Sequence, residues 1–270
     1  MPVTEADIPV ARLTGCLDSA VREAGALALG KFGAPLRNWT KGKNSPVCEA
    51  DIAVDHLLRE RLMAATPDYG WLSEESADDP RRLTARRVWV VDPIDGTRGF
   101  IAGRTDWAVS VALVENGRPL AAALFAPATD EMFGAAKGQG ATRNGQPIRT
   151  SAGTALAGAR FAGPPRRLEH LAAIAPGIET VPKIFSLALR LAAVATGALD
   201  AALAGPNSHD WDLAAADLLV HEAGGALTSI EGRPPIYNEP HPVHGALFAA
   251  GGARHAALLD LVRGRQTDFA

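Results

Sequence analysis

The chain has 270 residues, of which 47% are apolar, and a formal net charge of −3, so it is long enough for one large domain or two closely packed ones. No Lys/Arg run exceeds two residues, which argues against binding of a nucleic acid polymer. Two cysteines argue against a disulfide framework, and the N-terminus lacks a basic segment followed by an apolar one, so we expect a cytoplasmic protein without a membrane partner.

Two helices are predicted near the N-terminus. Apolar side chains at helical spacing predict a long packing helix over 5–30, with Thr4 as a candidate N-cap and Gly30 as a stop. A polar loop at 41–46 follows, and the apolar pattern after Asp51 predicts the second helix. Asp51 lies near the start of that helix, where it is either an ordinary capping carboxylate or a functional acid.

Two adjacent glutamates follow in a short predicted strand region. Glu74 and Glu75 come at the end of that strand, and a loop-like interval at 77–87 separates them from the apolar run at 88–91. If the two runs are neighbouring strands, Glu74 lies at the same sheet edge as Asp92. A Glu-Glu pair is otherwise a solvated surface feature, and both interpretations stay open.

The apolar run at 88–91 predicts a buried strand that leads to a pair of carboxylates. Pro93 is expected to end the strand, because proline has no N–H for a ladder. Asp92 and Asp95, three residues apart, would repel each other unless a cation lies between them, and a hard divalent cation prefers oxygen ligands. Gly96 permits a tight turn and the approach of an anion. The alternative is a strand followed by an Asp-rich turn.

Antiparallel strands are predicted for the middle of the chain. Alternating apolar and small residues, with Asn-Gly turns at 116–117 and 144–145, indicate a meander from one sheet. Its strands are expected at 107–115, 119–125, 131–136 and 141–148. A small and polar tract at 150–159 indicates a boundary between an N-terminal α+β half (1–150) and a C-terminal α/β half (151–270).

Helices and strands alternate in the second half. We expect helices at 166–174, 186–196, 212–223 and 253–262, and strands at 159–162, 199–203, 226–229 and 246–250. Asp212 opens the third of these helices and has an ordinary interpretation as its N-cap. His209, three residues earlier, is by itself more typical of a surface than of a ligand.

Four motifs resemble those of the inositol monophosphatase-like family of Mg²⁺-dependent phosphatases, over almost the full length of the chain. They are S-P-V-C-E-A-D at 45–51, S-E-E-S at 73–76, W-V-V-D-P-I-D-G-T at 89–97 and W-D-L-A-A-A-D-L-L-V-H-E-A-G-G at 211–225. Each alone is weak or moderate, whereas the four in this order and spacing are highly specific. The resemblance implies a layered αβαβα sandwich, with most metal ligands in the first half and Asp212 and the substrate-selecting loops in the second.

The resemblance implies a site with two or three Mg²⁺ ions. Glu74, Asp92 and the backbone carbonyl of Ile94 would hold one ion, and Asp92, Asp95 and Asp212 would hold a second. Four acidic side chains around two divalent cations leave a roughly neutral site that a phosphate dianion can enter. Hydrolysis of a phosphate monoester also needs an aligned water and a stabilised leaving oxygen, which paired metal ions supply.

Roles for the residues around the ions follow from the same resemblance. The Thr97 hydroxyl, hydrogen-bonded to Asp51, would help orient and deprotonate the attacking water, with Glu74 as a further catalytic residue. The amides of Gly96 and Thr97 would receive the phosphate, and Glu75 would support the metal ligands from behind.

One departure from the family pattern is Cys48, because the first motif usually has threonine at that position. The change removes a hydroxyl near Asp51 and alters local hydrogen bonding, but it removes no metal ligand.

The substrate is less clearly indicated than the reaction. Related phosphatases hydrolyse inositol phosphates, 3′-phosphoadenosine 5′-phosphate, histidinol phosphate or fructose 1,6-bisphosphate. Inositol-selective ones typically carry a glutamate several residues before W-D, and the segment 203–209 has none. Gly-Pro at 205–206 resembles the sequence of the bisphosphate nucleotidase (CysQ-like) branch, and Arg190 falls where that branch tends to carry a basic residue. A guanidinium there suits a second phosphate on the substrate. A solvated Arg190 is the alternative.

We therefore expect a 3′(2′),5′-bisphosphate nucleotidase, with inositol-1-phosphate and then histidinol-phosphate hydrolysis as alternatives. The resemblance also implies a homodimer, a small phosphorylated metabolite as ligand, and inhibition by Li⁺ through displacement of the second metal. A protein of this fold that only binds other proteins, with an idle site, is the alternative from another class. Five clustered acids argue against it, since an idle site has no chemical reason to keep them.

Overall fold

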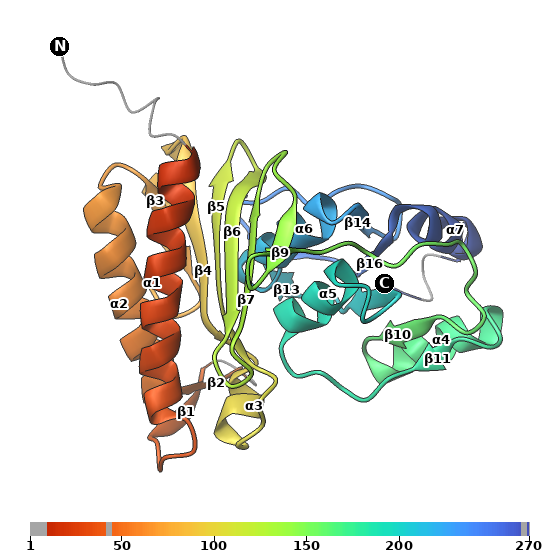
Figure 1. Ribbon diagram of the computed structural model, residues 1–270, viewed down its shortest axis with the longest axis horizontal. Helices are drawn as coiled ribbons and strands as arrows, with labels where there is room; N and C mark the ends of the chain where they lie inside the picture. Colours follow the sequence, from red (N-terminus) through yellow and green to blue (C-terminus); the bar gives the residue numbers. More distant parts are fainter. Residues whose placement is uncertain (1–9, 42–44, 266–268, 270) are drawn as a thin grey trace.

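A computed structural model describes residues 10–41, 45–265 and 269 (Figure 1). Its five layers are α1 (Val10–Lys31) with α2 (Glu49–Ala65), a seven-stranded sheet, α5 (Leu187–Ala195) with α6 (Asp210–Glu222), a five-stranded sheet, and α4 (Pro165–Ile174) with α7 (Gly252–Val262). The expected layered αβαβα sandwich is confirmed. Among the residues described, none of the helices combines the length and the apolar character that crossing a bilayer takes.

The seven-stranded sheet contains the predicted meander. In spatial order its strands are β3 (Gly70–Ser73), β4 (Arg87–Asp95), β5 (Ala108–Glu115), β6 (Arg118–Ala126), β7 (Glu131–Ala136), β8 (Ala141–Arg143) and β9 (Gln146–Pro147). β3 is parallel to β4, and β4 is antiparallel to β5. The strand before Glu74 therefore lies beside the strand that carries Asp92, as predicted. The expected loop at 77–87 contains a short 3-10 helix, η1 (Pro80–Thr84).

The five-stranded sheet belongs to the second half of the chain. In spatial order its strands are β11 (Glu179–Thr180), β10 (Arg160–Ala162), β12 (Ala201–Ala204), β16 (Leu247–Gly251) and β14 (Gly225–Ser229). β10 is parallel to both of its neighbours, and β16 is antiparallel to both of its own. Two small ladders pair β1 (Asn38–Lys41) with β2 (Ser45–Cys48) and β13 (Ser208–His209) with β15 (Val243–His244).

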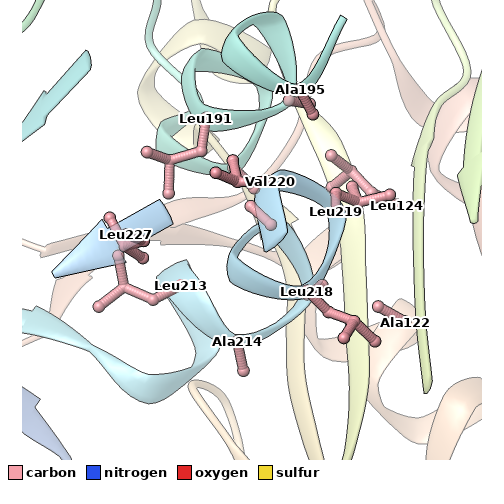
Figure 2. Packing of buried hydrophobic residues seen from close by; sticks show 14 of the residues in the cluster. Ala122, Leu124, Leu191, Ala195, Leu213, Ala214, Leu218, Leu219, Val220 and Leu227 are labelled. Atoms are coloured by element: carbon pink, nitrogen blue, oxygen red, sulfur yellow. The ribbon is translucent and has the colours of Figure 1, made fainter. Parts of the chain in front are cut away.

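Helix α6 lies at the centre of the core between the two sheets. An apolar cluster joins its Leu218 and Leu219 to Ala122 and Leu124 of β6 and to Leu191 of α5 (Figure 2). Each fully buried leucine contributes about 1.5–3 kcal/mol relative to an exposed one, so this packing fixes the position of the helix and of its first turn. The cluster contains residues from both halves of the chain, while the boundary at residue 150 stays a prediction.

Strand β4 differs from the expectation at Pro93. It continues through the proline to Asp95, so the prediction that Pro93 ends the strand is wrong. The ladder to β5 is irregular between Asp92 and Asp95, and β3 pairs with β4 only as far as Val91. Pro93 therefore lies where no backbone N–H is needed, which is where a strand tolerates proline.

Two helices for which an N-cap was predicted are α6 and α1. α6 begins at Asp210, so Asp212 is the third residue of the helix and not its N-cap. α1 is described from Val10, whereas the candidate N-cap Thr4 lies outside the described residues. Part of the expected polar loop forms the β1–β2 ladder, and its residues 42–44 likewise lie outside the described part of the chain.

Candidate active site

The four acids predicted as metal ligands line one cavity of about 260 Å³. Glu74 directly follows β3, and Asp92 and Asp95 lie in the last residues of β4, so the parallel pair of strands brings them to one sheet edge. Asp212 comes from the first turn of α6, in the layer between the sheets. The lining of the same cavity also includes Ile94, Gly96 and Thr97.

Asp92, Asp95 and Asp212 form an acidic cluster. Each offers a carboxylate oxygen within 4.8 Å of the others, and Asp92 and Asp95 are only 2% and 5% exposed. Burial, followed by the charges of neighbouring acids that include Glu74, raises the pKa of Asp92 and of Asp212 well above the usual range. Buried oxygens that repel one another in this way fit a hard divalent cation such as Mg²⁺.

The carboxylate of Asp95 is held by the start of α5. The Ser186 hydroxyl donates to its Oδ2, and the backbone N–H groups of Leu187 and Ala188 donate to Oδ1 and Oδ2 at 3.2 and 2.6 Å. Burial raises the pKa of Asp95, and these hydrogen bonds oppose the rise. A residue at the end of a first-half strand is therefore tied to a second-half helix.

Gly96 is required by the turn that follows the acids. Its φ is +93°, a left-handed conformation that favours glycine. A Cβ at this position would lie 3.0 Å from the carbonyl oxygen of Asp106 and 3.1 Å from the backbone nitrogen of Ser186. A larger residue would therefore strain the backbone and push the start of α5 away. The turn leads into α3 (Thr97–Ile101).

Asp51 and Thr97 contact each other next to Ile94. The Thr97 hydroxyl lies 3.1 Å from Asp51 Oδ1 and 2.9 Å from the carbonyl oxygen of Ile94, and its single proton serves one of them at a time. Asp51 is the third residue of α2, and its Oδ2 accepts from the backbone N–H of Cys48 at 2.9 Å. The carboxylate of Asp51 thus caps its helix and also contacts Thr97, and its functional role stays a prediction.

Glu75 lies outside the cavity and is buried, with a side chain that is 1% exposed. Its Oε2 is 2.7 Å from Lys41 Nζ, which also donates to the backbone carbonyl of Glu74 at 3.0 Å. Ser73 and Ser76, on either side of the glutamates, both donate to Asp55 at 2.5 and 2.6 Å. The ion pair and the two hydroxyls together fix the turn that presents Glu74.

The comparison with known families agrees with this geometry. The inositol monophosphatase family model matches residues 10–266. The chain belongs to the inositol monophosphatase family. It is therefore a phosphatase whose substrate is a small phosphorylated molecule, and the acids of the cavity occupy the positions of the family motifs.

Curated relatives of this inositol monophosphatase family member carry different names. An inositol-1-monophosphatase of Rhizobium meliloti is 36% identical over 234 residues, which cover 82% of this chain and 86% of that protein. A histidinol-phosphatase of Mycobacterium tuberculosis is 36% identical over 241 residues, covering 85% and 89%. The Nus factor SuhB of Escherichia coli K12 is 34% identical over 227 residues, covering 79% and 83%.

Solved structures of the family have the same fold. An IMPase of Thermotoga maritima superposes with a TM-score of 0.84 at 25% identity, covering 96% of this chain and 100% of that one. The suhB protein of Bartonella henselae gives a TM-score of 0.83 at 28% identity, covering 93% and 98%.

Cys48 partly replaces the threonine that is usual in the family. Its thiol lies 2.8 Å from Asp51 Oδ2, so the sulfur keeps a polar contact with that carboxylate. Burial, and then the charge of Asp51, raises the pKa of Cys48 to about 12. The thiol therefore stays protonated at neutral pH and is inert as a nucleophile.

Arg190 does not line the acidic cavity. Its guanidinium donates to the backbone carbonyls of Leu203 and Ile184 at 3.1 and 2.9 Å, and its charge opposes the rise that burial causes in the pKa of Asp95. Arg190 is thus not a solvated helix residue, because its guanidinium is hydrogen-bonded to the protein. It also does not line the cavity, as a residue that binds a second phosphate there would. Its placement in the first turn of α5 supports a structural role, in which it joins Ile184 to Leu203.

Sequence reasoning missed four residues at or next to the site: Lys41, Arg98, Lys183 and Ser186. Serine before an apolar helix is a recognisable N-cap, and Ser186 Oγ does accept from the backbone N–H of Leu189 at 2.9 Å. That signal reveals the cap but not the bond to Asp95. Arg98 and Lys183 line the cavity, and nothing in their local sequence brings them together.

Proposed function

We propose that the protein is a Mg²⁺-dependent phosphomonoesterase with two or three ions in the acidic cavity. The observation that carries this proposal is the convergence of four acids on one cavity. Glu74, Asp92 and the carbonyl of Ile94 would hold one ion, and Asp92, Asp95 and Asp212 a second. Bound Mg²⁺ supplies neutralisation of the phosphoryl oxygens and a more acidic water.

Thr97 and Asp51 are proposed to orient the attacking water. A Thr97 hydroxyl that donates to Asp51 has its oxygen lone pairs available. That oxygen can accept a hydrogen bond from the water and direct the water at phosphorus, in line with the leaving oxygen. The proton that the water loses would pass along this pair toward the carboxylate.

The turn at Gly96 is proposed to receive the reacting phosphate. Gly96 and Thr97 line the cavity, and the absence of a side chain at Gly96 lets an anion approach the backbone amides. Glu75 and Lys41 would act indirectly, by fixing the turn that presents Glu74.

Adenosine 3′,5′-bisphosphate is the first candidate substrate, because Arg98 and Lys183 line the cavity that holds the acids. Cations at that place suit a substrate with a second phosphate. Inositol 1-phosphate is the second candidate. It is supported by the relatives named inositol-1-monophosphatase in Rhizobium meliloti, Bacillus subtilis and Mesorhizobium japonicum, at 36%, 30% and 31% identity. Histidinol phosphate follows, from the Mycobacterium tuberculosis relative.

A side-by-side kinetic comparison of these three substrates tests the proposal. Phosphate release is measured with Mg²⁺ and with EDTA, and with millimolar Li⁺ added to the Mg²⁺ reactions. We expect turnover only with Mg²⁺, inhibition by Li⁺, and a kcat/KM for adenosine 3′,5′-bisphosphate about tenfold above the others, the effect of one charge-assisted contact. A preference for inositol 1-phosphate would reverse the substrate order and leave the reaction standing.

An interaction protein is the candidate from another class, favoured by the relatives named Nus factor SuhB. It predicts no Mg²⁺-dependent turnover of these substrates or of p-nitrophenyl phosphate. The homodimer that the family implies is a further proposal, and a sedimentation mass equal to one chain would reject it.

A further inference from the structure

We propose that Lys183, which lines the acidic cavity, is a specificity residue that binds a second phosphate of the substrate. The inference rests on the proposed phosphomonoesterase function and deepens it, because it concerns the end of the substrate that does not react. A single phosphate monoester would leave this position unused.

The charges that line the cavity leave a basic group in excess once two divalent cations are bound. Four acids line it, and the positive charge of two divalent cations equals theirs. Lys183 lines the same cavity and adds a positive charge beyond this balance. Lys183 precedes α5 in the second half of the chain, whereas the proposed phosphate amides are at the start of α3. Because the reacting phosphate would already have the amides and the ions, the charge of Lys183 is available to a second anionic group of the substrate.

The chain segment that carries Lys183 is fixed against the metal ligands. The backbone N–H of Phe185 donates to Asp106 Oδ2 at 2.7 Å, and that of Ser186 donates to the Asp106 carbonyl at 3.2 Å. The Ser186 hydroxyl donates to Asp95. Three residues after Lys183, the Ser186 side chain thus anchors the segment to a residue of the acidic cluster, which sets where the lysine side chain begins.

The charge of Lys183 has no counterpart within the described part of the chain. Its Nζ lies 4.4 Å from the centroid of the Phe185 ring, and it forms no ion pair with a described carboxylate. Arg104 lies over the same ring at 4.9 Å, but its Nε donates to Asp106 Oδ1 at 2.8 Å. A cation–π contact at an exposed site is weak, so the ammonium group is able to turn to an anionic ligand.

Arg190 is the other basic residue considered for a second phosphate, and its hydrogen bonds exclude it. Both of its terminal nitrogens donate to backbone carbonyls, those of Leu203 and Ile184. Freeing the guanidinium would break both of these hydrogen bonds, a cost that Lys183 does not face.

Two substrates that differ only in the second phosphate test the proposal. Adenosine 3′,5′-bisphosphate and adenosine 3′-phosphate are compared with the wild type, Lys183→Ala, Lys183→Arg and the control Lys137→Ala, another exposed lysine outside the cavity. We expect Lys183→Ala to raise KM for the bisphosphate about tenfold, the effect of a charge-assisted contact, with kcat unchanged. Its kinetics with the monophosphate should stay within about twofold, and Lys183→Arg should restore most of the loss.

Binding provides a readout that does not depend on turnover. In the Thr97→Ala background, which keeps every proposed metal ligand, titration calorimetry with Mg²⁺ should show tighter binding of the bisphosphate than of the monophosphate. Lys183→Ala should abolish that difference. Equal losses of affinity for both nucleotides would assign Lys183 to the reacting phosphate and overturn the proposal. Unchanged affinity for both nucleotides would overturn it as well. Absence of Mg²⁺-dependent turnover with an intact Lys183-dependent difference in binding would instead reject the phosphomonoesterase function alone.

Discussion

Asp51 and Asp212 occupy the same place on two different helices. Each is the third residue of its helix and accepts a hydrogen bond from the backbone N–H three residues earlier, at 2.9 Å from Cys48 and 2.6 Å from His209. The helix dipole favours a carboxylate there. Capping and function are therefore compatible roles for one side chain, which is why the local sequence alone leaves the two interpretations open.

Replacement of Asp95 by asparagine tests the acidic cluster at the residue scale. Asparagine keeps an oxygen acceptor for Ser186 and Ala188 but removes one ligand charge. We expect Asp95→Asn to lower kcat/KM at least about 100-fold, in keeping with the loss of a metal ligand. In thermal unfolding, Mg²⁺ should raise the Tm of the wild type and leave that of Asp95→Asn almost unchanged.

The matched control for this experiment is Asp68→Asn, which removes a carboxylate from an exposed position outside the cavity. It should behave as the wild type in both measurements. Normal turnover by Asp95→Asn, or a Mg²⁺-dependent rise in its Tm as large as that of the wild type, would remove Asp95 from the proposed ligands.

At the scale of elements, α6 combines a cavity residue at its start with a buried acid at its centre. Asp217 is 2% exposed, its Oδ2 accepts from the Tyr237 hydroxyl at 3.0 Å, and Arg118 lies 3.8 Å away. Sequence patterns predicted this helix and its Gly-Gly end, because apolar residues recur along it. They did not predict its first two residues, since the β13–β15 ladder and the cap at His209 depend on distant contacts.

The pH dependence of stability tests the environment of Asp217. Burial raises its pKa from 3.8 to about 6. The folded state therefore holds the proton of Asp217 more tightly than the unfolded state does. Protonation of Asp217 stabilises the fold fully below pH 4, and this stabilisation is lost as the pH rises through about 6. The loss amounts to about 3 kcal/mol in total. Asp217→Asn is neutral throughout, so its free energy of unfolding relative to the wild type should rise by that amount between pH 4 and 7.5.

Urea unfolding of both proteins at several pH values measures this difference. Tyr237 can still donate to the asparagine oxygen, which keeps the local hydrogen bond in the comparison. A difference that stays constant with pH would contradict the assigned environment of Asp217.

At the scale of the whole molecule, the layered architecture could be predicted from the family motifs, and the meander from alternation and Asn-Gly turns. The meeting of Glu74 with Asp92 also followed from the order of strands. The position of Lys183 could not be predicted, because it depends on how Asp106 and Asp95 hold the segment before α5. Contacts of that kind join residues about 80 to 90 positions apart and leave no periodic signal in the sequence.

Shared packing around α6 predicts that the two halves unfold together. Leu219 is fully buried in a cluster that contains residues of both sheets. We expect Leu219→Ala to lower the free energy of unfolding by about 2–5 kcal/mol. Tryptophan fluorescence, dominated by four tryptophans at positions 39–107, and far-UV circular dichroism should report the same shifted midpoint.

The surface variant Leu29→Ala, at a position 43% exposed on α1, is the control and should change stability little. Separate transitions by the two probes would show that residues 1–150 and 151–270 unfold independently.

The bond between Ser186 and Asp95 constrains how this protein can change during evolution. The segment 183–186 begins with the lysine that is proposed to select the substrate and ends with the serine that donates a hydrogen bond to Asp95 of the acidic cluster. A mutation that moves the segment to accept a new ligand therefore also disturbs affinity for the ions. New preferences should arise more readily by exchange of single side chains on this segment than by insertions or deletions within it.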